Sequence, residues 1–108
     1  MKYSPVQNYI NGQFVGSAGK TMDIISPIDG KLLSSVPMSG KGDLDLAVKA
    51  AKKAFETWSK TPIKERVQVF FRYKYLLEKH LKELAELCSE ENGKTYGESV
   101  AEIEKCIE

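Results

Sequence analysis

The fold is decided by a stretch in the middle of the chain, residues 43–58, which has the sequence DLDLAVKAAKKAFETW. Apolar side chains recur in this stretch at steps of three and four residues, which is the period of an amphipathic helix. These positions are Leu44, Val48, Ala51, Phe55 and Trp58. The alanines between them favour a helix and allow a neighbouring element to approach closely. With Asp43 as its N-cap, the sequence predicts a helix over residues 43–60.

The chain before this stretch predicts strands and tight turns. Two short β-prone runs flank Asn11-Gly12, and both residues tolerate the positive φ that a two-residue hairpin turn requires. A second pair of runs flanks residues 27–30, whose sequence Pro-Ile-Asp-Gly is typical of a turn. We therefore predict two β-hairpins within residues 1–37.

The chain after this stretch predicts one long helix over residues 62–93. Thr61-Pro62 is a helix-start signal, because proline at the first helical position lacks only an N–H that would be unpaired anyway. Gly93 fits a left-handed C-cap at the other end. Val69, Tyr73 and Leu76 widen the apolar stripe of this helix, which predicts contacts on two of its sides.

The last residues, 95–108, predict a helix that is incomplete. Thr95 and Glu98 have the spacing of a capping box, in which each side chain bonds the other residue's backbone N–H. No Gly, Asn or Pro stops the helix before Glu108. We therefore expect an α+β chain, with two N-terminal β-hairpins followed by two long helices and the start of a third. We also expect residues 1–108 to be the N-terminal portion of a larger protein.

Composition excludes several classes of function. The chain has 16 Lys and Arg against 15 Asp and Glu, a net charge of +1, and no basic block that would mark a nucleic-acid surface. No apolar run is long enough to cross a membrane, and the N-terminus lacks the apolar stretch of a signal peptide. The two cysteines are not in a Cys-x-x-Cys pattern, which favours a reducing compartment. We expect a soluble cytoplasmic protein without nucleic-acid or membrane partners.

Two phosphate-loop candidates fail on spacing. Gly19-Lys20 and Gly93-Lys94 resemble the end of such a loop, but the glycine required five positions earlier is replaced by Phe14 and by Cys88, respectively. The dinucleotide-binding pattern Gly-x-Gly-x-x-Gly does not occur in the sequence. The residues therefore predict no cofactor-binding site in this chain.

The nucleophile candidates are equally weak. His80 is the only histidine, so it forms neither a multi-histidine metal site nor a triad with placed partners, and we interpret it as a surface histidine. Cys88 continues the apolar stripe of the predicted long helix and is interpreted as a small core residue. Cys106 fits either a core or an interface. A nucleophilic cysteine needs a basic or helix-N-terminal setting, so we predict no catalytic residue.

Taken in order, the residues of the chain resemble the N-terminal segment of the aldehyde dehydrogenase superfamily. The segments that carry the resemblance are Tyr9-Ile10-Asn11-Gly12-Gln13-Phe14-Val15, Ser26-Pro27, Asp29-Gly30, Val36-Pro37, Asp45, Ala47-Val48, Ala50-Ala51, Ala54-Phe55, Trp58, Pro62, Glu65-Arg66, Glu91 and Gly93-Lys94. Arg72-Tyr73 and residues 81–85 are most similar to the CoA-acylating methylmalonate-semialdehyde dehydrogenases. Ser26 departs from the asparagine that is commoner in the family.

The resemblance implies an NAD(P)-dependent oxidation of a semialdehyde, with methylmalonate semialdehyde converted to an acyl-CoA. A cysteine thiolate of the enzyme forms a thioester, the NAD cofactor accepts the hydride, and CoA or water takes the acyl group. It also implies a homo-oligomer, either a dimer or a tetramer. The family's nucleophile and cofactor loops follow the segment that is present here, so this segment is expected to be a scaffold and inactive alone.

The resemblance implies one site on this chain. Some family members bind a monovalent cation through backbone carbonyls before the Asn-Pro turn and an acidic side chain at the end of the long helix. The matching positions are Ile24, Ile25 and Glu91. An acidic residue at a helix C-terminus opposes the helix dipole, and a bound cation would account for Glu91 there.

A second interpretation from a different class stays open. The predicted long helix could serve a free-standing protein-interaction module that docks by its apolar faces and has no catalytic activity. If the chain is instead part of a larger enzyme, it would leave apolar surface uncovered in isolation, so we expect it to self-associate or to be poorly soluble. A stable monomer would favour the module.

Overall fold

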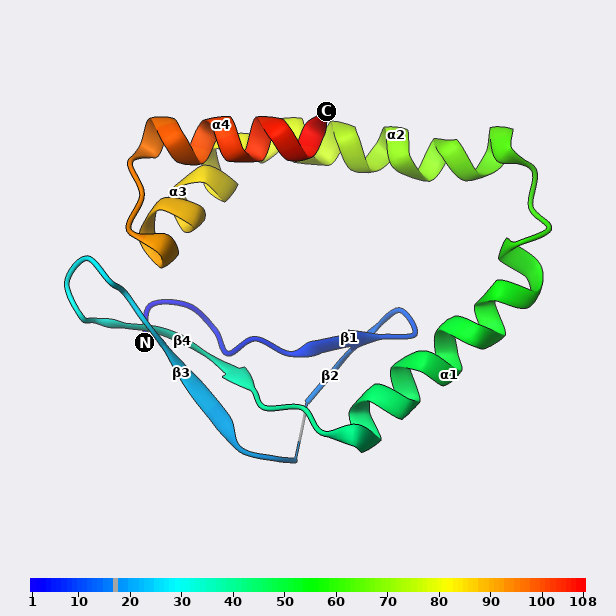
Figure 1. Cartoon of the computed structure of the whole chain (residues 1–108), viewed down its shortest axis with the longest axis horizontal. Coiled ribbons are helices and arrows are strands. Elements are labelled where there is room, and N and C mark those ends of the chain that lie inside the picture. Colours follow the sequence, from blue (N-terminus) through cyan, green and yellow to red (C-terminus); the bar gives the residue numbers. More distant parts are fainter. Residues whose placement is uncertain (17) are drawn as a thin grey trace. The chain divides into compact units, whose positions relative to one another are not determined.

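The structure is a computed structural model that describes residues 1–16 and 18–108. Figure 1 shows two antiparallel hairpins followed by four helices. The chain divides into two compact units: residues 1–25 with 32–61, and residues 26–31 with 62–108. The predicted α+β class is confirmed, with two small sheets and four helices instead of the two long helices and the start of a third that the sequence predicted.

The first hairpin of unit 1 forms as predicted around Asn11-Gly12. Strand β1 is Asn8–Ile10 and strand β2 is Gln13–Val15. Asn11 and Gly12 have φ values of 53° and 76°, the left-handed conformation that the turn requires. Tyr9 and Phe14 face each other across the pair, with ring centroids 5.0 Å apart in an edge-to-face arrangement that aromatic pairs favour.

The second hairpin, β3 (Thr21–Ile25) and β4 (Leu32–Pro37), is also antiparallel. The N-terminal residues cover the other edge of β4, since the N–H groups of Tyr3 and Val6 donate to the carbonyls of Leu33 and Ser35, each at 2.8 Å. With both edges of β4 covered, residues 33–35 are buried. Buried Ser34 is satisfied because its hydroxyl donates to the Ser4 carbonyl at 2.7 Å.

Helix α1 (Lys41–Trp58) begins two residues before the predicted start at Asp43. The N-cap is Gly40, and Asp43 occupies the third helical position. From there its carboxylate accepts the Gly40 N–H at 3.0 Å, so it satisfies a free donor of the first turn from inside the helix. The predicted range 43–60 is therefore wrong at both ends.

The prediction of one long helix over residues 62–93 is wrong. The helix breaks at His80, which separates α2 (Ile63–Lys79) from α3 (Leu81–Asn92) in unit 2. His80 has φ −103° and ψ 14°, which lies outside the helical region. Its ring Nδ1 lies 3.2 Å from a carboxylate oxygen of Glu83 in the first turn of α3, where an acidic side chain complements the helix dipole. At the other end, Pro62 is the N-cap of α2 and Ile63 is the first helical residue.

Helix α4 (Tyr96–Ile107) starts with the predicted capping box. The Glu98 N–H donates to the Thr95 hydroxyl, and the Thr95 N–H donates to the Glu98 carboxylate, each at 3.2 Å. Helices α3 and α4 pack closely enough to bury Ala85 and Ser99 completely. Small side chains at both positions allow this close approach.

The turn of residues 26–31 belongs to unit 2 with the helices. Gly93, which ends α3 with φ 68°, lies against Pro27 of this turn, so that a Cβ added at Gly93 would meet Pro27 Cγ at 3.2 Å. Asp29 accepts the Lys31 N–H at 3.0 Å, and this hydrogen bond, aided by the nearby Lys31 charge and opposed by slight desolvation, lowers the pKa of Asp29. The turn and the end of α3 therefore form one packed region.

The described residues bury little apolar surface. Leu33 and Ala85 are the only buried hydrophobic residues among them. Helix α1 has no buried residue, and Phe55 and Leu44 on its stripe are 65% and 62% exposed. Apolar helix faces of this kind are stable when another surface covers them. Among residues 1–16 and 18–108, the helices are too short or too polar to cross a membrane.

Candidate functional site

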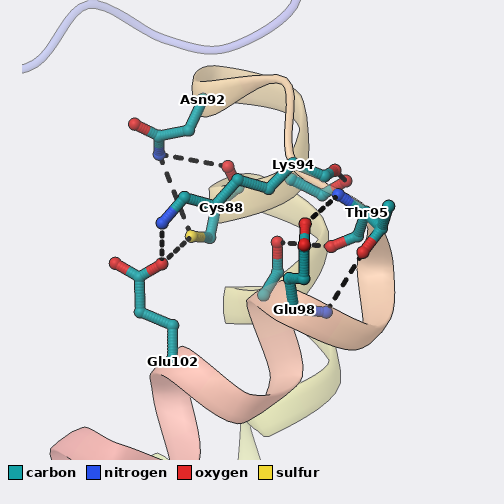
Figure 2. A network of polar contacts seen from close by, with 8 residues as sticks. Cys88, Asn92, Lys94, Thr95, Glu98 and Glu102 are labelled. Carbon is teal, nitrogen blue, oxygen red and sulfur yellow. Dashed lines mark hydrogen bonds and ion pairs between the residues drawn. The ribbon is translucent and has the colours of Figure 1, made fainter.

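The most developed polar site of the described chain lies where α3 turns into α4. Figure 2 shows Lys94 of the connecting segment pairing with the carboxylate of Glu102 on α4. The thiol of Cys88 on α3 donates to the same carboxylate oxygen at 3.7 Å. Asn92 donates to the Cys88 carbonyl at 3.1 Å and lies 3.8 Å from its sulfur. We refer to these four residues as the junction cluster.

Local sequence explains how the junction cluster forms. Gly93 ends α3 in the left-handed conformation, which turns the chain back on itself within a few residues. The Thr95 capping box then fixes the start of α4. These two devices bring Lys94 close to the second turn of α4, where Glu102 lies.

The charges of the junction cluster stabilise each other. The hydrogen bond and charge of Lys94 lower the pKa of Glu102, and the hydrogen bond and charge of Glu102 raise the pKa of Lys94. Both side chains keep more than 40% of their surface exposed, and solvent weakens ion pairs of this kind. The junction cluster therefore positions α4 on α3 and lacks the low-dielectric setting that strong electrostatic catalysis needs.

The prediction that Cys88 is a core residue is wrong. Cys88 was predicted as a small core residue, but its side chain is only half-buried and contacts a carboxylate and an amide. Sequence reasoning also missed the Lys94–Glu102 pair, because the two residues are eight positions apart and do not share one helix. The capping box and Gly93 were the available signals that the chain reverses between them.

The predicted cation-site residues fall in different units. Ile24 and Ile25 are consecutive residues of β3 in unit 1, at the irregularity in the β3–β4 register. Glu91 is an exposed residue in the last turn of α3 in unit 2. Within residues 1–16 and 18–108, no group of three His, Cys, Asp or Glu side chains is arranged to hold a metal ion. The site was predicted to use two backbone carbonyls, and it stays a prediction.

Unit 1 contains an open groove of about 570 Å³ between β1 and the start of α1. Its charged lining residues already have structural roles, since Lys41 pairs with Asp45 at 2.6 Å and Asp43 caps the helix. Much of the remaining lining is apolar or small, including Tyr9, Ile10 and Ala47. The groove therefore offers packing surface and no group that is free for catalysis.

Comparison with known proteins identifies the class. The aldehyde dehydrogenase family matches residues 14–108, and the chain belongs to this family. The resemblance seen in the sequence is thus confirmed. Malonate-semialdehyde dehydrogenase 1 of Geobacillus thermodenitrificans is 49% identical over 104 residues, which cover 95% of this chain and 22% of that protein.

Solved structures agree with the sequence match. The methylmalonate-semialdehyde dehydrogenase of Oceanimonas doudoroffii has a TM-score of 0.92 and 31% identity over 97% of this chain and 22% of its own. An NAD-dependent aldehyde dehydrogenase of Sinorhizobium meliloti has a TM-score of 0.91 and 32% identity over 99% of this chain and 22% of its own. The chain thus spans about a fifth of the length of the proteins it matches.

Proposed function

We propose that this chain is the N-terminal portion of an NAD-dependent semialdehyde dehydrogenase. The observation that carries the proposal is the 49% identity to a malonate-semialdehyde dehydrogenase over 95% of the chain, together with the family match. The substrate is malonate or methylmalonate semialdehyde. The enzyme oxidises it through a cysteine thioester, and CoA takes the acyl group.

The role of this segment in the enzyme is scaffolding. The described residues include an ion-pair cluster, two helix caps and a small-residue helix contact, and each of these serves packing. The NAD cofactor, when bound, supplies the hydride acceptor. The catalytic cysteine and the cofactor-binding loops are expected to follow this segment in the enzyme, so we assign no step of the reaction to its residues. The complete enzyme would be a cytoplasmic homo-oligomer.

A chimeric enzyme tests the substrate assignment. The matching first fifth of the Geobacillus thermodenitrificans protein would be replaced by this chain. NADH formation would then be measured with malonate semialdehyde, with methylmalonate semialdehyde and with unrelated aldehydes, each with and without CoA. We expect semialdehyde oxidation that depends on CoA. The substrate and acceptor come mainly from the Geobacillus portion, so the same panel must be run on the natural enzyme from which this chain comes. Oxidation of unrelated aldehydes alone by that enzyme would contradict the assignment.

The cation site is a separate proposal. We expect the carbonyls of Ile24 and Ile25 and the carboxylate of Glu91 to bind a monovalent cation in the complete enzyme. Thermal unfolding would be measured in sodium, in potassium and in a bulky organic cation. Glu91→Gln should abolish the difference among these salts, while Glu86→Gln, on the same helix, should leave it intact. An unchanged salt dependence in Glu91→Gln would rule the site out.

The alternative, a free-standing interaction module, rests on the exposed apolar faces of the helices. It predicts that the isolated chain is a folded monomer that binds a partner. An active chimera would favour the dehydrogenase, and a stable monomeric chain with an inactive chimera would favour the module.

A further inference from the structure

We draw no further inference here: the strongest candidate, the half-buried thiol of Cys88 where α3 turns into α4, belongs to the junction cluster already described, and its contacts with Glu102 and Asn92 account for its place there without a ligand.

Discussion

At the scale of single residues, Glu102 is the centre of the junction cluster, because both Lys94 and Cys88 contact its carboxylate. Cys88 is a partner in this cluster and not the core residue that its place in an apolar stripe predicted. The sequence could not show this, because the contact depends on how two helices meet and not on the period within either of them.

Glu102→Gln should remove the pH dependence that the ion pair gives to α4. The pKa of Glu102 is lowered from its ordinary value of 4.5, so its contribution is present above that pH and is lost as the pH falls through the lowered value. The pKa of Lys94 is raised from 10.5, so its contribution is present below that pH and is lost as the pH rises through the raised value. The ion pair therefore acts fully between these two limits.

Amide hydrogen exchange in α4 measures this effect. The protection of natural α4 should exceed that of Glu102→Gln at neutral pH, and the two should converge as the pH falls through the lowered pKa of Glu102. Glu104→Gln, on the same helix, is the control and should behave like the natural chain. Equal protection in all three chains at neutral pH would show that the ion pair contributes nothing measurable, as happens with many exposed pairs.

Gly93→Ala should destabilise unit 2 by about 1–2 kcal/mol or more, because a side chain in the left-handed conformation costs about that much. The added Cβ would also meet Pro27 Cγ at 3.2 Å, which is tighter than an ordinary contact. Urea unfolding would measure the change. Gly97→Ala is the matched control, since a Cβ added there meets no atom within 4 Å and Gly97 lies inside α4. If both variants unfold at the same urea concentration, this account of Gly93 is wrong.

At the scale of elements, the features that neighbouring residues determine were predicted correctly, and several helix boundaries were not. The Asn11-Gly12 turn and the Thr95 capping box were both predicted, because neighbouring residues satisfy them. The break at His80 was missed, because no glycine or proline marks it. The start of α1 was also missed, because Asp43 caps the helix from its third position and looks in sequence like an N-cap.

Thr95→Ala should fray the start of α4 and cost about 1 kcal/mol, since it removes the acceptor for the Glu98 N–H. The loss would appear as faster hydrogen exchange in the first turn of α4. Thr95→Ser should retain most of the protection, because serine offers the same hydroxyl. Thr57→Ala, which removes a hydroxyl at the end of α1, should leave α4 unchanged. Equal exchange in Thr95→Ala and the natural chain would contradict the capping role.

At the scale of the whole molecule, the chain carries a family identity, while the polar groups of the junction cluster and of the helix caps serve packing and capping. The described residues bury only two hydrophobic side chains, while Phe55, Phe70 and Phe14 are each more than 60% exposed. The order of short motifs identified the aldehyde dehydrogenase family. The reaction could not be derived from the same residues, because the matched proteins are about five times as long.

The isolated chain should self-associate, because large apolar side chains such as Phe14, Phe55 and Phe70 are exposed and exposed apolar patches drive association. Light scattering over a range of protein concentrations would measure this. Mass should increase with concentration, and the chain should bind a dye that reports exposed apolar surface. A monodisperse monomer at high concentration would instead support the free-standing interaction module.

The central claim is that these 108 residues are the scaffold of an aldehyde dehydrogenase, and paired NADH-formation assays test it most directly. The isolated chain, the Geobacillus remainder alone and the chimera that joins them would be assayed with the same semialdehyde. We predict no activity from either part alone and dehydrogenase activity from the chimera. A chimera that folds and binds NAD but does not oxidise the aldehyde would contradict the claim.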